Sequence, residues 1–170
     1  MTKPLGVGLT LNALRMDDCS ESMQQRVFKS MTTLNKYACD VLKKYDVHAL
    51  TDVTGFGLLV HLNEMLDDKN SAIIYKDSIP YFDDCKRYVE EFYLSGAAQT
   101  NRNSVEGKIY FDCDFFTEEI LFDPQTSGGL LASVSKEDLM DIKKNFIENN
   151  IELYVVGEVI DKNEYNVYVR

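Results

Sequence analysis

The chain has 170 residues, 45% hydrophobic and 27% charged, a composition typical of one soluble globular domain. Its net charge of −10 repels phosphodiester backbones and excludes nucleic-acid binding through bulk charge. No apolar run reaches the roughly 20 residues that span a bilayer, and the N-terminus has no apolar signal segment, so we expect a cytoplasmic protein without membrane contact.

The pattern of apolar residues predicts interleaved helices and strands. In chain order we expect a strand at 3–14, a helix at 20–45, a strand at 47–51, a helix at 58–66, a strand at 73–75, a helix at 81–94, a polar loop at 95–107, strands at 108–112 and 130–134, a helix at 135–149, and strands at 153–160 and 165–169. Ser20 is the expected N-cap of the first helix. The predicted class is α/β or α+β, with helices packed on a mixed sheet.

A strand-to-helix junction at residues 51–57, TDVTGFG, is the first segment that suggests chemistry. A carboxylate such as Asp52 at the end of a strand can hold Mg²⁺ through its oxygens. Hydroxyls of Thr51 and Thr54, the Gly55 amide and the following helix N-terminus can donate to phosphate oxygens. A simpler interpretation stays open, in which Asp52 caps the helix and the glycines only turn the chain. The segment lacks the GK[ST] of a P-loop.

Two further segments are candidates for a ligand loop. Residues 123–129, DPQTSGG, form a glycine-containing loop in which Ser127 and Gly128 could approach a ligand closely, or else an ordinary turn between strands. In residues 96–103, Arg102 with its flanking asparagines Asn101 and Asn103 could meet a phosphate, or else form a solvated loop.

No catalytic residue is predicted, because no serine, cysteine or lysine has a recognisable activating partner. His61, on the expected helix after the glycine turn, is interpreted as a hydrogen-bonded structural histidine rather than a general base. The four cysteines stand far apart without a CxxC pair, so we expect free thiols and no zinc site. They are Cys19, Cys39, Cys85 and Cys113.

The amino-acid sequences of these segments closely resemble the selenophosphate synthetase (selenide, water dikinase) family. The matching segments follow the family order and cover the chain from end to end. The resemblance is carried by KPLG at 3–6, LNK at 34–36, HALTDVTGFGLL at 48–59, HL at 61–62, LFDPQTSGGLL at 121–131 and GEV at 157–159.

The resemblance implies the C-terminal-domain fold shared with aminoimidazole ribonucleotide synthetase, which is partly ferredoxin-like. It implies a parent reaction in which ATP, selenide and water give selenophosphate, AMP and phosphate. Asp52 then helps to bind the Mg²⁺ that bridges the ATP phosphates, and Thr51, Thr54 and Gly55 belong to the phosphate environment. Residues 1–170 are expected to be a single C-terminal domain, whose N-terminal partner supplies the reactive residue, most carboxylates and the dimer contacts of a homodimer. The fragment alone is expected to be inactive.

Two departures from the family pattern bear on these expectations. Val60 replaces a usual glycine, and the loop from Gly96 has fewer glycines, which weakens the transfer of phosphate-binding roles to Asn101 and Arg102. Two alternatives stay open at this point. One is a related enzyme of the same superfamily with another acceptor, and the other is a non-catalytic binding module.

Overall fold

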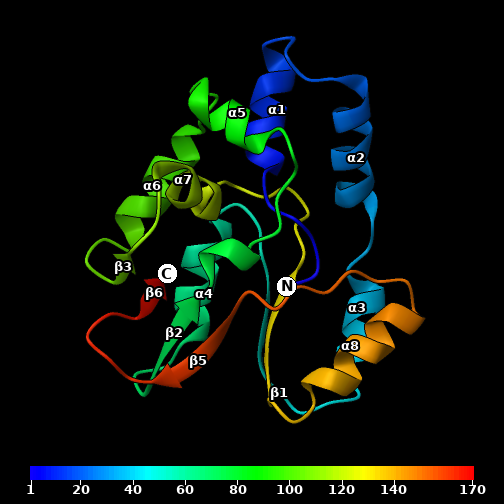
Figure 1. Cartoon of the computed structure of the whole chain (residues 1–170), viewed down its shortest axis with the longest axis vertical. Coiled ribbons are helices and arrows are strands. Elements are labelled where there is room, and N and C mark those ends of the chain that lie inside the picture. Colours follow the sequence, from blue (N-terminus) through cyan, green and yellow to red (C-terminus); the bar gives the residue numbers. More distant parts are fainter.

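The computed structural model describes all residues, 1–170, as helices arranged around two sheets (Figure 1). The helices are α1 (Val7–Arg15), α2 (Glu21–Thr32), α3 (Lys36–Leu42), α4 (Gly57–Met65), α5 (Cys85–Glu90), α6 (Gly96–Ser104), α7 (Phe115–Phe122) and α8 (Leu139–Glu148), with a 3₁₀ turn η1 (Lys76–Ser78). The strands are β1 (Val47–Asp52), β2 (Asn70–Ile74), β3 (Ile109–Phe111), β4 (Leu130–Val134), β5 (Gly157–Asp161) and β6 (Val167–Val169).

The larger sheet is mixed, as expected, with the strand order β3-β6-β2-β5. β6 runs parallel to both β3 and β2, while β5 is antiparallel to β2. The smaller sheet is the antiparallel pair β1 and β4, in which Asp52 lies opposite Leu130. This pairing brings together the ends of two segments that are far apart in the chain.

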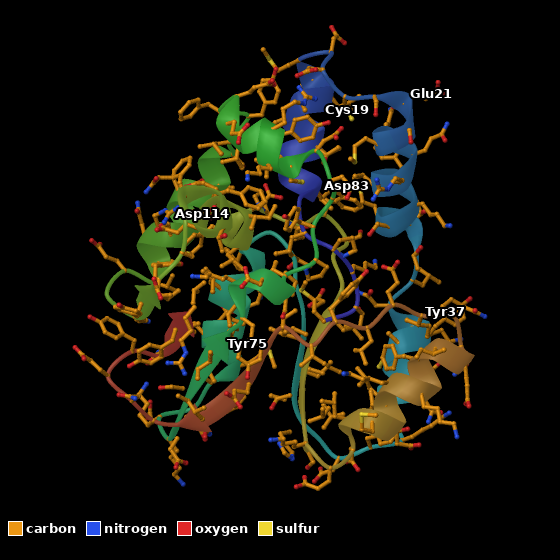
Figure 2. All side chains as sticks on the ribbon, viewed as in Figure 1. Cys19, Glu21, Tyr37, Tyr75, Asp83 and Asp114 are labelled. Atoms are coloured by element: carbon orange, nitrogen blue, oxygen red, sulfur yellow. The ribbon has the colours of Figure 1, made fainter.

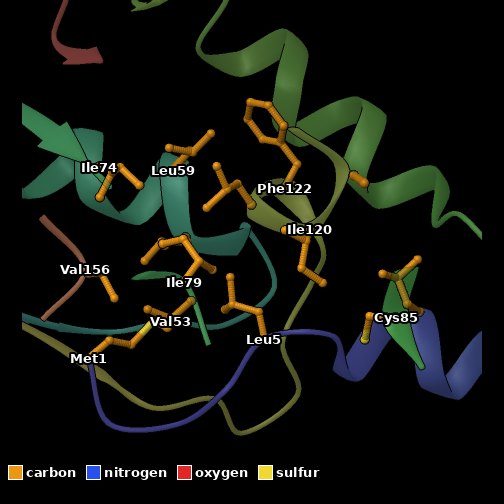
Figure 3. Packing of buried hydrophobic residues seen from close by; sticks show 14 of the residues in the cluster. Met1, Leu5, Val53, Leu59, Ile74, Ile79, Cys85, Ile120, Phe122 and Val156 are labelled. Carbon is orange, nitrogen blue, oxygen red and sulfur yellow. The ribbon is translucent and has the colours of Figure 1, made fainter. Parts of the chain in front are cut away.

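Two separate hydrophobic clusters form the core between the helices and the two sheets. The larger cluster has 29 buried residues, and Figure 3 shows Leu5, Leu59 and Phe122 among them. The smaller cluster has 6 residues and joins α3 and α8 to β4, through Phe146 among others. Figure 1 shows α3 and α8 together beside β1, away from α1 and α5. The β1–β4 pair is therefore supported by a small core of its own.

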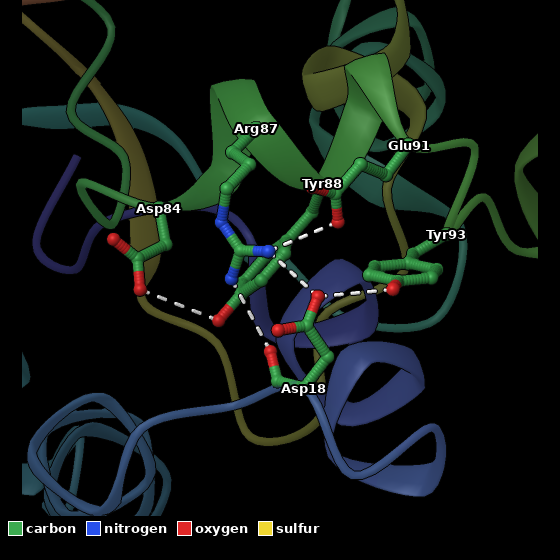
Figure 4. A network of polar contacts seen from close by, with 6 residues as sticks. All are labelled: Asp18, Asp84, Arg87, Tyr88, Glu91 and Tyr93. Atoms are coloured by element: carbon green, nitrogen blue, oxygen red, sulfur yellow. Dashed lines mark hydrogen bonds and ion pairs between the residues drawn. The ribbon is translucent and has the colours of Figure 1, made fainter.

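Ion pairs fix the outer helices to their neighbours. Arg26 on α2 contacts Asp83 at 2.6 Å, and Figure 2 shows Asp83 beside that helix. Arg87 on α5 donates to Asp18 at 2.6 Å, and the Tyr93 hydroxyl donates to the same carboxylate at 2.9 Å (Figure 4). The Arg87 guanidinium holds the pKa of Asp18 below its ordinary value. These contacts connect the turn after α1 to α5.

The expected strand at 3–14 is wrong, because residues 7–15 form α1. Gly6 begins the helix with a left-handed φ of 110°, which suits glycine. Val7, Leu9 and Ala13 are buried, so the apolar residues fit a helical face as well as a strand. The Asp123 carboxylate accepts the Gly8 N–H in the first turn of the helix, a favourable place for a negative charge that the local pattern does not reveal.

The expected helix at 20–45 is two helices, α2 and α3. Ser20 is the N-cap, as predicted, and accepts from the Met23 N–H at 3.2 Å. The first helix ends at Thr33, whose backbone is extended and whose carbonyl accepts from the Lys3 amine. The contact with Lys3 thus lies at the point where α2 ends, before α3 begins.

The expected polar loop at 95–107 is wrong, because it contains α6, capped by Ser95 and buried at Ala98 and Asn101. The helices expected at 81–94 and 135–149 are present but shorter, as α5 and α8. The helix α7 was not predicted, although Asp114 is its N-cap and accepts from the Thr117 N–H at 2.9 Å. The remaining expected elements are confirmed within a few residues of their ends, although the strand at 153–160 begins only at Gly157. No helix combines the length and apolar character of a membrane span. All four cysteines are free, as expected.

Candidate functional site

Asp52 is the last residue of β1, and its side chain is exposed at the end of the strand. The carboxylate takes part in no hydrogen bond or ion pair within the chain, whereas the next residue, Val53, is fully buried. It does not cap the following helix, since α4 begins five residues later with Gly57 at a φ of 74°. Asp52 is therefore available to a ligand.

The second segment lies directly against the first. The Val53 N–H donates to the Gly129 carbonyl at 2.8 Å, and the Gln125 N–H donates to the Thr54 carbonyl at 3.0 Å. A Cβ on Gly128 would lie 2.0 Å from the Val53 carbonyl oxygen, so only glycine allows this approach. Residues 51–57 and 123–129 therefore form one continuous surface region, which we call the double loop.

Two side chains, those of Lys3 and Asn35, donate hydrogen bonds to the backbone of residues 123–129. The Lys3 amine donates to the carbonyls of Thr33 and Ser127, both at 2.8 Å, and Asn35 donates to the Gly128 carbonyl at 2.8 Å. Lys3 is only 7% exposed, and this burial lowers its pKa. Both residues belong to segments that carry the family resemblance, which was the only signal for them in the sequence.

Residues 126 and 127 of the double loop expose backbone N–H groups as hydrogen-bond donors. Ser127 has a left-handed φ of 51°, and it is exposed together with Thr126. The backbone N–H groups of these two residues have no acceptor within the chain. Such unpaired N–H groups can bind the oxygens of an anion.

The third segment supports the double loop rather than extending it. Asn101 is 3% exposed and donates to the Gly55 carbonyl at 3.0 Å and the Phe122 carbonyl at 3.1 Å. Arg102 is paired with Glu118 at 2.6 Å and also with Glu119, so its guanidinium is already occupied. Asn103 is exposed and accepts from Gln99 at 2.9 Å. The possible phosphate role of these residues gains no support from their contacts.

Asp123 is a buried carboxylate that the sequence did not reveal as special. It accepts from the Gly8 N–H at 2.9 Å and from the Gln125 amide at 2.8 Å, while its Oδ1 atom has no partner. Burial raises the pKa of Asp123 to about 7, and the hydrogen bonds from Gly8 and Gln125 oppose this rise. The carboxylate positions the double loop against α1.

His61 is hydrogen-bonded, as expected. Its Nε2 atom lies 3.2 Å from the Thr54 hydroxyl, and its Nδ1 atom lies 3.2 Å from the Glu64 carboxylate. The Phe56 ring lies over it at 5.7 Å between ring centroids. His61 thus supports the turn that follows Asp52.

The double loop offers oxygen donors of the kind that a magnesium site uses. The Asp52 carboxylate and the Thr54 hydroxyl are hard oxygen donors, the type that Mg²⁺ prefers, whereas Thr51 precedes Asp52 in β1 and its side chain lies on the opposite face of the strand. No three histidine, cysteine or acidic side chains gather closely enough to hold a metal ion by themselves. Two large hollows, of about 960 and 1010 Å³, are lined by other residues. Mg²⁺ at this place would therefore need further ligands from outside the chain.

Comparisons with known proteins show the family to which the chain belongs. The family model described as AIR synthase related protein, C-terminal domain, matches residues 1–170. The chain is 42% identical over 171 residues to the selenide, water dikinase of Agathobacter rectalis, with 99% of the chain and 50% of that protein covered. It is 36% identical over 168 residues to the enzyme of the same name from Desulfitobacterium hafniense, covering 98% of the chain and 49% of that protein. The chain thus spans about half the length of these curated relatives.

Solved structures show the same fold at low sequence identity. Thiamine monophosphate kinase from Aquifex aeolicus matches with a TM-score of 0.64 and 18% identity, over 99% of this chain and 48% of that one. The corresponding enzyme from Stenotrophomonas maltophilia matches with a TM-score of 0.55 and 14% identity. These likenesses support the fold class alone.

Proposed function

Because the chain belongs to the AIR synthase related protein family, whose C-terminal domain it matches from residue 1 to residue 170, we propose that it is the C-terminal half of a selenide, water dikinase. The relatives of that name are 33–42% identical to it and about twice as long. The proposed reaction converts ATP, selenide and water into selenophosphate, AMP and phosphate. We assign it to the intact, cytoplasmic homodimeric enzyme, and expect no turnover from the isolated domain.

Within this proposal, Asp52 contributes one carboxylate oxygen to Mg²⁺ bound with ATP. The observation that carries the assignment is that Asp52 is exposed and free of intramolecular partners, directly beside the second segment of the double loop. The bound metal ion would neutralise charge on the phosphates. This matters in a chain of net charge −10, which otherwise repels a polyphosphate.

The neighbouring groups serve the same ligand. Thr54 supplies a hydroxyl oxygen near the metal and phosphates, Thr51 serves the phosphate environment through the strand end that carries Asp52, and Gly55 leaves space for close approach, since a Cβ there would contact nothing within 4 Å. The Ser127 N–H is available to a phosphate oxygen, and Gly128 gives its loop the required shape. Water exclusion and the remaining metal ligands are assigned to the N-terminal half.

The proposal is tested in the protein that joins this domain to its N-terminal half, by measuring ATP-dependent selenophosphate formation. We expect Asp52→Asn to lower activity by about 100-fold or more, because a neutral amide binds Mg²⁺ less strongly. Asp68→Asn is the matched control, since Asp68 is exposed and its carboxylate takes part in no hydrogen bond or ion pair within the chain. Equal activity of the two variants, or ATP turnover with another acceptor in place of selenide, would overturn the proposal.

A further inference from the structure

Three side chains form a line that ends at the double loop. Glu64 contacts the His61 Nδ1 atom at 3.2 Å, and the His61 Nε2 atom contacts the Thr54 hydroxyl at 3.2 Å. The histidine side chain is 10% exposed, whereas the Glu64 side chain is 56% exposed. Thr54 lies two residues after Asp52, so the line connects a surface carboxylate to the candidate site.

The backbone of Thr54 is held in place as well. Its carbonyl oxygen accepts both the Gly57 N–H and the Gln125 N–H, each at 3.0 Å. The hydroxyl has no partner other than His61. The position of the hydroxyl oxygen is therefore set by the fold, and the direction of its proton is set by the imidazole.

The direction of that proton follows from the donor and acceptor rules. An ionised carboxylate only accepts hydrogen bonds, so Glu64 requires the proton of a neutral His61 on Nδ1. Nε2 then carries a lone pair and accepts from the Thr54 hydroxyl. A hydroxyl has one proton, which is now committed to His61, and its remaining lone pairs are free.

We propose that Glu64 and His61 are positioning residues. They orient the Thr54 hydroxyl so that its oxygen offers lone pairs to Mg²⁺ or to a water bound to it. A phosphate oxygen would meet a lone pair of Thr54 and be repelled, whereas Mg²⁺ or a water bound to it would be attracted. The inference rests on the proposed function, and it changes the part that Thr54 plays there from phosphate donor to cation ligand. A carboxylate at Asp52 and an accepting hydroxyl at Thr54 are both donor types suited to a hard cation.

The proton positions are measured on the 170-residue chain by ¹⁵N NMR of the imidazole nitrogens at neutral pH. The chain has only two histidines, so a His48→Gln variant assigns the signals. We expect His61 to show a protonated Nδ1 and an unprotonated Nε2. A protonated Nε2 with an unprotonated Nδ1 would overturn the inference.

Glu64 provides the matched pair of variants, and its exposure makes a folding defect from its replacement small. Glu64→Ala should let the proton redistribute toward Nε2. Glu64→Gln should keep it on Nδ1, because the amide oxygen still accepts. Identical spectra for Glu64→Ala and the native chain would show that the carboxylate does not set the tautomer, contrary to the proposal.

The consequence for magnesium is measured in the joined enzyme. We expect Thr54→Val and Glu64→Ala to raise the Mg²⁺ concentration for half-maximal activity by about tenfold, while KM for ATP at saturating Mg²⁺ stays the same. Thr54→Ser should behave like the native enzyme. A raised KM for ATP at every Mg²⁺ concentration would instead indicate a phosphate donor and overturn the inference. If Asp52→Asn also left activity intact, the proposed function itself would fail, whatever the NMR result.

Discussion

The carboxylate of Asp123 and the backbone N–H of Gly8 are 2.9 Å apart, and this hydrogen bond joins the double loop to the first turn of α1. The two residues are 115 positions apart in the chain. A Cβ on Gly8 would lie 2.5 Å from the Asp123 Oδ1 atom, so the contact also requires glycine. Because Asp123 is 1% exposed, its charge is costly, and folding stability depends on its protonation.

We expect the contribution of Asp123 to the free energy of unfolding to fall as pH rises from about 4 to about 7. Burial lowers the pKa of the Met1 amine to about 5, which contributes in the opposite direction, so a comparison of variants is needed to isolate Asp123. Burial raises the pKa of Asp123 to about 7 in the folded chain, while the unfolded chain loses the same proton near its ordinary value of 3.8. The folded state therefore binds more protons than the unfolded state in this range, and the difference between the two pKa values corresponds to about 4 kcal/mol. Urea unfolding of the native chain and of Asp123→Asn from pH 4.5 to 8 measures the difference.

The variant should lose this part of the pH dependence, so that its stability relative to the native chain improves steadily up to pH 7 and then stays level. Asp68→Asn, which changes an exposed carboxylate, should follow the native curve. Parallel curves for Asp123→Asn and the native chain would contradict the assignment of the titration to Asp123.

Asn101→Ala should destabilise the chain by about 1–3 kcal/mol, because it leaves the buried carbonyl of Phe122 without its side-chain donor and removes a second hydrogen bond to the Gly55 carbonyl. Asn103→Ala, on the same helix but exposed, should change stability by no more than about 0.5 kcal/mol. Chemical denaturation of both variants is the measurement. Equal stability of the two variants would show that the hydrogen bonds of Asn101 do not hold the helix, since replacement of Asn by Ala in a helix is favourable by propensity.

Gly128→Ala and Gly55→Ala should differ strongly, although both glycines belong to the double loop. The first Cβ would meet the Val53 carbonyl at 2.0 Å, and overpacking of this kind costs about 1–3 kcal/mol or more. The second would meet nothing within 4 Å, so Gly55→Ala should keep its native melting temperature. A melting temperature for Gly128→Ala equal to that of Gly55→Ala would show that the strand ends are not in close contact.

Lys3→Met should loosen the double loop locally. Loss of the amine leaves the carbonyls of Thr33 and Ser127 unpaired, at a cost of about 1–3 kcal/mol. Hydrogen exchange should then accelerate roughly tenfold or more at the Val53 N–H, which donates to Gly129. Lys29→Met, an exposed change on α2, serves as the control, and equal protection in both variants would count against the role of Lys3.

The elements predicted correctly are those whose pattern depends on their own residues. The strands β1 and β4 and the helix α4 have continuous apolar faces and glycine or polar residues at their ends, so local rules place them well. α1 and α6 depend on distant contacts instead. Asp123 lies at the start of α1, and the burial of Asn101 turns a polar, asparagine-rich stretch into a packed helix. Local patterns carry no information about such partners.

The candidate site shows the same division. Asp52, Thr54, Gly55 and Ser127 could be chosen from residue type and from the family resemblance, and β1–β4 pairing brings their two segments together. Their roles toward Mg²⁺ and phosphate stay predictions. Four further residues have supporting roles that could not be predicted from the sequence, because most of their partners are backbone carbonyls and N–H groups more than 20 positions away. They are Lys3, Asn35, Asn101 and Asp123.

The double loop is held by side chains that bond to its backbone from the interior of the domain, and this affects which of its residues can be exchanged. Its shape is maintained by buried amines and amides bonded to backbone atoms, which exist whatever the outward side chain is. Substitutions at Asp52, Thr126 or Ser127 can therefore alter the chemistry presented at the surface while the main-chain path is retained. The interior of the domain can in this way stay unchanged while a few outward residues are exchanged.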